Sequence, residues 1–301
     1  MQKNIVAEPQ LAGQGKQKIE WVKRNMPILR QIEEDFRKHQ YFRGLRVLVC
    51  IHLEAKTAYL AQVFNAGGAE VAVTGSNPHS TKDDVVAALA EEGMHVYARY
   101  GATAEEMRQY MNLALDVRPN IMIDDGGDIA ELLHTERQEL LPEVLGACEE
   151  TTTGVLRAKA RAKAGVLEFP VVLINDARCK YLFDNYHGTG QSVWDGVMRT
   201  TNLVVSGKTV VIIGYGWCGK GCAERAQGLG ANVIVCEVDP IKAADALMHG
   251  LRVMPLNQAV PEGDIILTVT GGKHVIRQEH YESMKDGVIL ANAGHFKIEF
   301  D

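Results

Sequence analysis

The chain has 301 residues, of which 46% are hydrophobic and 23% are charged, as in ordinary globular proteins. The formal net charge is −6 at pH 7, which argues against nucleic acid as a partner. No apolar stretch reaches the roughly 18 residues of a membrane helix and no signal peptide is recognisable, so we expect no membrane association and a cytoplasmic location. A chain of this length is expected to form two domains.

The first half of the chain alternates between helix and strand patterns. Apolar residues at helical spacing over residues 16–39 predict a helix that Pro27 kinks or divides. Further helices are expected at 55–65, 82–92, 104–115, 129–141 and 151–163. Short β-branched runs predict strands at 46–52, 69–74, 95–97, 120–124, 144–148 and 171–174. This alternation predicts a parallel sheet flanked by helices.

Residues 175–191 are polar and rich in glycine, and without a regular pattern they are predicted to be a junction. A helix at 192–204 then leads into a second set of βα units. The βα units of this set run past Val210, Val233, Arg252, Ile265 and Val288. The predicted fold is therefore α/β with two domains, 1–185 and 186–301, each a parallel sheet flanked by helices.

Three glycines with the spacing G-x-G-x-x-G, Gly214, Gly216 and Gly219, join a short β-branched strand to a helix. In a dinucleotide-binding turn the first glycine permits the turn, the second lets the backbone approach the pyrophosphate, and the third lets the helix pack on the strand. The next strand ends at Glu237, close to where a ribose-binding carboxylate is expected, and no arginine follows it. The second domain is thus predicted to be a Rossmann domain that binds NAD rather than NADP.

Polar residues gather where the predicted strands end. They form five clusters, at residues 50–52, 124–128, 149–153, 175–176 and 292–295. Because ligands of open α/β sheets bind beyond the carboxyl ends of the strands, we expect the site there, in a cleft between the two domains.

The six cysteines are scattered and lie mostly inside predicted helices and strands, where they are expected to be reduced thiols that act as small hydrophobic residues. Cys218 and Cys222 are one helical turn apart. No second pair of Cys or His stands at metal spacing beside them, so we expect no metal site.

Seven segments carry a specific pattern: 52–57 (HLEAKT), 76–81 (SNPHST), 124–128 (DDGGD), 149–154 (EETTTG), 180–185 (KYLFDN), 214–221 (GYGWCGKG) and 294–296 (GHF). Together they resemble the S-adenosyl-L-homocysteine hydrolase family, over a match that runs from about Ile19 to Asp301. So many ordered motifs in one chain are far more specific than the glycine triplet alone.

The resemblance implies reversible hydrolysis of a small nucleoside thioether, S-adenosyl-L-homocysteine, to adenosine and homocysteine, a step of the methyl cycle in one-carbon metabolism. In this family a tightly held NAD oxidises the ribose 3′-hydroxyl, which acidifies the 4′ hydrogen. Proton removal then expels homocysteine, water adds in its place, and the sugar is reduced again. The resemblance also implies a homo-oligomer, namely a tetramer, and it implies that the chain lacks the usual C-terminal portion, as a fragment or a truncated homologue.

The resemblance assigns roles to residues that match the family's motifs. The implied catalytic residues are His52, Asp125, Glu150, Lys180, Asp184, Asn185 and His295. Lys180 and Asp184 act at the 3′-hydroxyl, with Asn185 and Glu150 close by. Asp125 and His52 transfer protons at the 4′ and 5′ positions, and His295 closes on the sugar.

The residues implied to bind NAD are Thr151, Thr152, Thr153, Asn185, Gly214, Tyr215, Gly216, Gly219, Glu237, Lys242, Ala293, Gly294 and His295. Those implied to bind the substrate are His52, Glu54, Lys56, Thr57, Asp125, Glu150, Lys180 and Asp184. Two positions depart from the familiar members, because Thr189 replaces a cysteine and Lys242 replaces a frequent asparagine.

Lys56 leaves the identity of the purine open. Many members carry a glutamate there, which accepts hydrogen bonds from the adenine 6-amino group, whereas lysine only donates and hypoxanthine offers a 6-oxo acceptor. S-inosyl-L-homocysteine is therefore the alternative substrate. Against this, Glu54 could supply the missing acceptor, or Lys56 could simply pair with Glu54 at a helix N-terminus.

Two other classes of function are compatible with the predicted fold. An NAD-linked 2-hydroxy acid dehydrogenase would have a similar cofactor domain, but it predicts net redox and exchange of NADH with solvent. A non-catalytic NAD-binding module predicts loss of Lys180, Asp184, Asp125 or His52, and all four are present.

Overall fold

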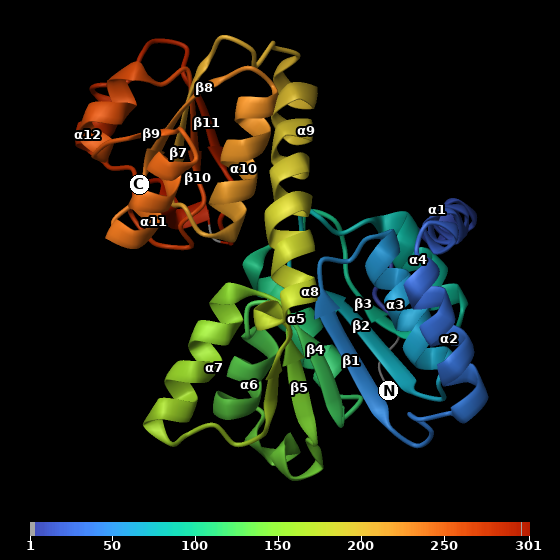
Figure 1. Cartoon of the computed structure of the whole chain (residues 1–301). Coiled ribbons are helices and arrows are strands. Elements are labelled where there is room, and N and C mark those ends of the chain that lie inside the picture. Colours follow the sequence, from blue (N-terminus) through green and yellow to red (C-terminus); the bar gives the residue numbers. More distant parts are fainter. Residues whose placement is uncertain (1–3, 296) are drawn as a thin grey trace. The chain divides into compact units, whose positions relative to one another are not determined.

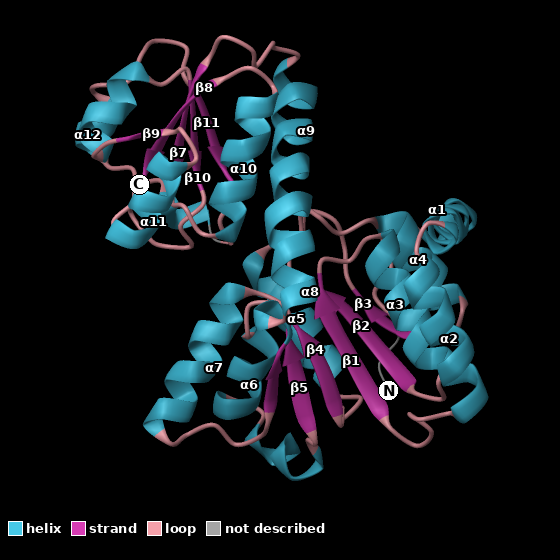
Figure 2. Ribbon diagram, in the orientation of Figure 1, coloured by secondary structure: helices cyan, strands magenta, loops and turns pink. Residues whose placement is uncertain are grey.

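The structure, a computed structural model, describes residues 4–295 and 297–301. The chain divides into two compact units, unit 1 up to Asn175 and unit 2 from Asp176 onward (Figure 1). Each unit contains one parallel sheet with helices around it, which confirms the predicted α/β class (Figure 2). Residues 176–185 belong to unit 2 by their contacts, whereas the predicted boundary places them in the first domain. The limits of the functional domains stay a prediction.

Unit 1 contains a six-stranded parallel sheet. Its strands are β1 (Arg46–Ile51), β2 (Glu70–Gly75), β3 (His95–Tyr97), β4 (Ile121–Asp124), β5 (Gly146–Glu149) and β6 (Val171–Leu173). They lie in the order β3-β2-β1-β4-β5-β6, so the chain builds outward from β1 to one edge and then returns to place β4 on the other side of β1. This reversal creates a topological switch point between β1 and β4, the usual place for a ligand.

Helices α1 (Ala12–Arg24) and α2 (Pro27–His39) precede β1. The connections between the strands contain α3 (Ala55–Ala66), α4 (Asp83–Glu91), α5 (Ala104–Leu115), α6 (Asp128–Thr135) and α7 (Thr152–Ala164), and the unit also has short 3-10 turns, η1 (Pro9–Leu11), η2 (Gln138–Glu143) and η3 (Ile174–Asp176). The predicted helix is divided in two at Pro27, which is the first residue of α2. Proline is tolerated at this position because the N–H group that it lacks would have no partner within the helix. Successive residues of β1 face opposite sides of the sheet. Val47 and Val49 pack with α1, α3 and α4, while Leu48 and Cys50 pack with α5 and α6, so helices cover both faces.

Unit 2 contains a five-stranded parallel sheet of β7 (Thr209–Ile213), β8 (Asn232–Cys236), β9 (Arg252–Val253), β10 (Ile265–Thr268) and β11 (Ile289–Asn292). The order is β11-β10-β7-β8-β9, which is the Rossmann order with its switch point between β7 and β10. Its helices are α8 (Arg178–Lys180), α9 (Thr189–Thr201), α10 (Trp217–Gly228), α11 (Pro240–Met248), α12 (Leu256–Ala259) and α13 (Gln278–Tyr281), with the 3-10 turns η5 (Val260–Glu262) and η6 (Lys297–Glu299).

The segment 175–191, predicted to be an irregular junction, is instead almost wholly helical. Helix α8 leads into a π-helix, η4 (Tyr181–Gly188), which continues directly into α9. Of the two glycines that suggested a loop, Gly190 serves close helix packing. A Cβ atom at Gly190 would lie 2.6 Å from the carbonyl oxygen of Gly221 in α10, and one at Gly221 would overlap the carbonyl oxygen of Tyr186. Tertiary packing thus overrides the local glycine signal.

No helix within residues 4–295 and 297–301 is both long enough and apolar enough to cross a membrane.

The contact between η4 and α10 gives a stability prediction. Gly221→Ala should destabilise unit 2 by about 1–3 kcal/mol, because its methyl group has no room beside Tyr186. Gly196→Ala in α9 is the matched control, since a Cβ there meets nothing within 4 Å and alanine is the better helix former by up to about 1 kcal/mol. Urea unfolding followed by tryptophan fluorescence measures both variants. Equal midpoints for the two variants would contradict this packing argument.

Candidate active site

In unit 1 the predicted side chains follow adjacent strands at one edge of the sheet. His52 follows β1, Asp125 follows β4 and Glu150 follows β5. Because β1 and β4 pair in register at the switch point, the first two side chains meet, with His52 Nε2 3.4 Å from Asp125 Oδ2. Asp125 is buried, whereas about half of the His52 side chain is exposed. This close contact is the centre of the candidate site in unit 1.

Two serines complete this pair, and their roles are not apparent from the sequence pattern. Ser76 Oγ donates to Asp125 Oδ2 at 2.7 Å. Ser80 Oγ lies 2.6 Å from His52 Nδ1, and its hydroxyl donates to the carbonyl of Asn77 at 3.1 Å. Ser80 therefore accepts from Nδ1–H, which leaves Nε2 facing Asp125 as the nitrogen that can take or give a proton. Both serines follow β2, the neighbour of β1, and this position was the one sequence feature that could have placed them near His52.

The residues predicted to meet the purine lie at the start of α3. Glu54 is the N-cap of this helix, and its Oε1 accepts from the backbone N–H of Lys56 at 2.9 Å and of Thr57 at 3.4 Å. The Lys56 ammonium lies 4.0 Å from the same oxygen, on a side chain that is 65% exposed. Thr57 is buried and donates from Oγ1 to the carbonyl of His52 at 2.5 Å. Thr57 thus anchors the backbone of His52, and Glu54 is engaged as a helix cap.

Glu150 and the three threonines follow β5. The backbone N–H of Glu150 donates to the carbonyl of Asp124 at 2.9 Å, which ties the start of the loop after β5 to the last residue of β4. Thr151 is the N-cap of α7 without a side-chain capping bond, and Thr152 Oγ1 accepts from Asn175 Nδ2 at 3.1 Å. Thr153 is half-buried in the first turn. The NAD contacts predicted for the three threonines stay predictions.

In unit 2 the π-helix brings three predicted side chains together. Lys180 Nζ lies 3.0 Å from Asp184 Oδ2 and donates to Asn185 Oδ1 at 2.8 Å. A π-helix has a wider turn than an α-helix, so residues four and five positions ahead face the same side chain. The Lys180 side chain is only 13% exposed, while Asp184 is open to solvent. The arrangement holds the amine at a fixed place between a carboxylate and an amide.

The departure at Thr189 joins the same cluster. Cys218 in the glycine segment makes contacts of 3.8 Å with Thr189 Oγ1 and with Asn185 Nδ2. Burial raises the pKa of the Cys218 thiol. A protonated thiol here serves as a packing and weakly hydrogen-bonding group.

The glycine turn has the shape that a dinucleotide needs. Gly214 adopts φ +101°, a conformation in which a side chain would be strained. A Cβ at Gly216 would meet nothing within 4 Å, so the backbone there is open to a close ligand, whereas one at Gly219 would overlap the carbonyl of Gly214. Helix α10 begins directly after Gly216 and presents its free N–H groups at this turn. These residues fit the pyrophosphate of NAD.

Glu237 stands at the end of β8 beside the glycine turn. Its carboxylate accepts from the backbone N–H of Tyr215 and Val238, both at 2.7 Å, and of Asp239 at 3.0 Å. Burial alone would raise the pKa of Glu237, but these hydrogen bonds and the charge of Lys242 outweigh it and hold the pKa below its usual value. Glu237 is therefore an anion, the form that accepts hydrogen bonds from ribose hydroxyls.

The last predicted cluster follows β11. The backbone N–H of Ala293 donates to the carbonyl of Thr268 at the end of β10. Gly294 leaves room for the buried Glu299 carboxylate, which a Cβ at this position would overlap. His295 is half-buried next to it, and Phe296 of the same motif lies outside the described residues. Over residues 4–295 and 297–301, no three His, Cys, Asp or Glu side chains are grouped as metal ligands.

Two buried carboxyl groups lie directly beneath the unit 1 site. Asp124 and Glu149 are paired in register on β4 and β5 and are 1% and 3% exposed. Burial raises the pKa of Asp124 to about 7. Burial, together with the charge of Asp124, raises the pKa of Glu149 to about 8.

These raised pKa values predict the pH dependence of stability. Between about pH 5 and pH 8 the folded protein keeps protons that the unfolded chain has lost, so the free energy of unfolding should fall as the pH rises through this window. Glu149→Gln removes one of the two groups and should flatten the slope. Thermal unfolding midpoints of both proteins test this, and histidine titration cancels in the comparison. Identical slopes would contradict the assignment.

Comparison with known proteins gives two matching family models. The model of the S-adenosyl-L-homocysteine hydrolase family matches residues 3–145, and the model of that family's NAD binding domain matches residues 185–301. The crystal structure of a dipicolinate synthase chain from Bacillus halodurans superimposes with a TM-score of 0.52 at 12% identity, covering 86% of this chain and 85% of that one. This likeness concerns the fold alone.

Curated relatives are much closer in sequence. The adenosylhomocysteinase of Pyrococcus abyssi is 57% identical over 294 residues, which are 98% of this chain and 70% of the relative. The S-inosyl-L-homocysteine hydrolase of Methanopyrus kandleri is 56% identical over 296 residues, again 98% of this chain and 70% of the relative. The second half of the chain is thus an NAD-binding domain, and the chain belongs to the S-adenosyl-L-homocysteine hydrolase family.

Proposed function

We propose that this protein is an enzyme that reversibly hydrolyses S-adenosyl-L-homocysteine to adenosine and homocysteine and holds NAD tightly while it does so. The observation that carries the proposal is the pairing of His52 with Asp125 at 3.4 Å, in a chain that also has an NAD-binding domain. Bound NAD supplies reversible oxidation of the ribose 3′-hydroxyl of the substrate. The protein's own side chains bind the nucleoside and move its protons.

Lys180 takes the proton of the 3′-hydroxyl and later returns it. Asp184 and Asn185 hold its amine at 3.0 and 2.8 Å, and the exposed carboxylate of Asp184 is also able to accept from a sugar hydroxyl. Glu150 and His295 are assigned to the same ribose by their place in the family motifs. Proton transfer at the 3′ hydroxyl is thus assigned to Lys180, at the end of α8, supported by Asp184 and Asn185 of the π-helix.

Asp125 and His52 serve the 4′ and 5′ carbons. One of them removes the 4′ proton, and the pair then delivers a proton to the departing homocysteine sulfur and takes one from the water that replaces it. Ser76 fixes the Asp125 carboxylate at 2.7 Å, and Ser80 fixes the imidazole through Nδ1 at 2.6 Å. Two groups joined by a hydrogen-bonded network can exchange a proton without a large movement.

S-inosyl-L-homocysteine is the second candidate substrate, and one observation favours it. Glu54, the residue that could replace the missing purine acceptor, is engaged by the backbone N–H groups of Lys56 and Thr57 as a helix cap. The exposed Lys56 ammonium then remains as a donor that suits a 6-oxo purine. Relatives of both names match the chain equally well.

The proposal extends to the setting of the enzyme. We place it in the cytoplasm, in the methyl cycle, and as a homotetramer. The methyl cycle and the tetramer rest on the family alone, whereas the cytoplasmic location is the expectation drawn from the sequence.

The proposed activity is tested on protein purified with its bound NAD. Incubation with S-adenosyl-L-homocysteine should release homocysteine without accumulation of NADH, because oxidation and reduction cancel over one turnover. A 2-hydroxy acid dehydrogenase would instead give NADH from a hydroxy acid, and a non-catalytic module would give neither product. Either of these results would refute the proposal.

Asp125→Asn should lower kcat by about 10²- to 10⁴-fold, the usual contribution of a general acid or base. Asn keeps the size of the side chain and can accept from Ser76, but it cannot carry the proton. Bound NAD measured on the same preparation serves as the control for folding. A variant with full turnover and full NAD content would show that Asp125 has no part in proton transfer.

Measurement of kcat/KM for S-adenosyl- and S-inosyl-L-homocysteine on one preparation identifies the purine that the enzyme prefers. If Lys56 contacts the purine, Lys56→Glu should shift the ratio of the two values toward the adenosyl substrate, and a mismatched polar edge can cost as much as about 10⁴-fold. Lys82→Glu, on the neighbouring loop before α4, is a control for the change of charge. An unchanged ratio in Lys56→Glu would remove this residue from purine recognition.

A further inference from the structure

Glu149, the last residue of β5, holds together the two loops that carry the candidate carboxylates of unit 1. Its Oε1 accepts from the backbone N–H of Gly126 at 2.9 Å and from that of Thr151 at 3.1 Å. Gly126 directly follows Asp125, and Thr151 directly follows Glu150. A single oxygen atom therefore receives one N–H from the residue after each candidate carboxylate.

The fold reserves space for this carboxyl group. A Cβ atom at Gly154, in the first turns of α7, would overlap both oxygens of Glu149. Glu149 and Asp124 also line one small cavity of about 20 Å³, together with Gly127, Gly154 and other residues of α7. The glycine that ends the EETTTG segment is thus explained by the position of the Glu149 carboxyl group.

The surroundings of Glu149 suit a neutral hydrogen-bond acceptor. The residue is 3% exposed, and burial, with the nearby charge of Asp124, raises its pKa to about 8. At neutral pH most molecules then carry a protonated Glu149, whose carbonyl oxygen can accept both N–H groups. Glutamine has the same shape and presents the same acceptor.

We propose that Glu149 is a positioning residue. It holds the loop after β4 and the loop after β5 at a fixed distance from each other and so sets the positions of Asp125 and Glu150. This inference rests on the proposed function. It adds a residue that touches neither the purine nor the sugar but controls the groups that move protons. Misplacement of catalytic groups by about 1 Å can cost about 100-fold in rate, so such a clamp has a large effect on turnover.

The test compares Glu149→Leu with Glu149→Gln in the NAD-loaded protein. Leucine fills a similar volume but leaves both N–H groups without their acceptor, so kcat should fall by about 100-fold with little change in KM. Glutamine should restore most of the turnover, because it restores the acceptor. Gly154→Ala provides a second route to the same loss, since its methyl group displaces the Glu149 carboxyl group while alanine itself favours the helix.

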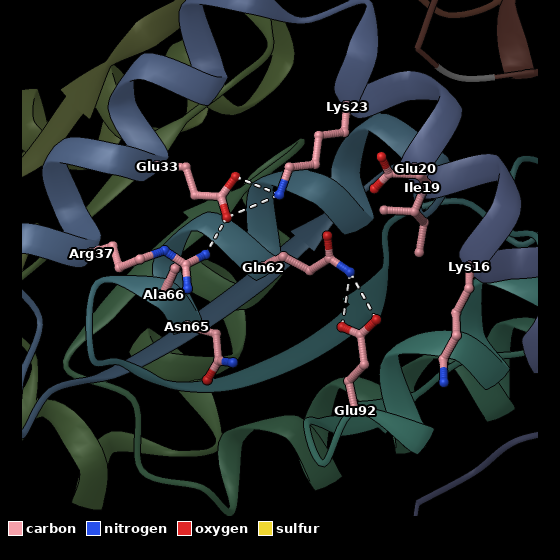
Figure 3. Close-up of a pocket in the computed structure, with 10 residues that line it drawn as sticks. All are labelled: Lys16, Ile19, Glu20, Lys23, Glu33, Arg37, Gln62, Asn65, Ala66 and Glu92. Carbon is pink, nitrogen blue, oxygen red and sulfur yellow. Dashed lines mark hydrogen bonds and ion pairs between the residues drawn. The ribbon is translucent and has the colours of Figure 1, made fainter.

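Glu33→Leu is the matched control. Glu33 is another buried acid of unit 1, on α2, where it binds Lys23, Arg37 and the hydroxyl of Tyr59 at the edge of a surface cavity of about 430 Å³ (Figure 3). It lies outside the residues assigned to substrate or NAD. Loss of this carboxylate should lower the unfolding midpoint and leave kcat unchanged.

Hydrogen exchange supplies a readout that does not depend on activity. Peptides that contain residues 126 and 151 should exchange faster in Glu149→Leu and at the wild-type rate in Glu149→Gln. Wild-type kcat and exchange in Glu149→Leu would overturn the positioning role, as would an equal loss of kcat in Glu33→Leu. If Glu149→Leu fails to fold, wild-type kcat in Gly154→Ala overturns it. A wild-type protein without thioether hydrolysis would refute the proposed function, while the exchange data would still decide whether Glu149 clamps the loops.

Discussion

The candidate site of unit 1 depends on one constraint, the strand order of the parallel sheet, in which the chain returns after β3 to place β4 beside β1. All strands of such a sheet end at the same edge, and β4 lies beside β1 although two strands and several helices separate them in the sequence. His52 and Asp125 meet because of this order. Ser76 and Ser80 join them because β2 is the other neighbour of β1. The strand order therefore determines which side chains meet in the site. The buried carboxyl groups of Asp124 and Glu149, the last residues of β4 and β5, hold the loops that carry Asp125 and Glu150.

Unit 2 uses glycine for two different physical purposes. At Gly214 the residue permits a backbone conformation with positive φ, and at Gly216 it leaves open space for a ligand. At Gly190 and Gly221 it lets two helices approach until carbonyl groups touch the facing backbone. The second use keeps the π-helix against α10. The π-helix in turn places Asp184 and Asn185 beside Lys180, the last residue of α8. The cofactor turn and Lys180, the proposed base, are thus parts of one packed structure.

Much of this was available from the sequence, and the failures have physical causes. The β-branched runs and the glycine spacing predicted the strands and the NAD turn, because burial on both faces of a parallel sheet leaves a strong local signal. Residues 175–191 misled the prediction, since glycine looks the same in a loop and in a close helix contact. The roles of Ser76, Ser80 and Glu149 were not predicted, because the partners of each hydroxyl or buried carboxyl group come from strands that lie far away in the sequence.

The central claim is that the His52 and Asp125 pair moves a proton at a carbon next to an oxidised one, and solvent deuterium tests it most directly. The NAD-loaded protein is allowed to turn over whichever of S-adenosyl- or S-inosyl-L-homocysteine it accepts, in D₂O. Deuterium should then enter the 4′ position of the nucleoside, as mass spectrometry and proton NMR would show. The incorporation should fall in parallel with kcat when Asp125 is replaced by Asn. Release of homocysteine with no deuterium at the 4′ carbon would contradict the account.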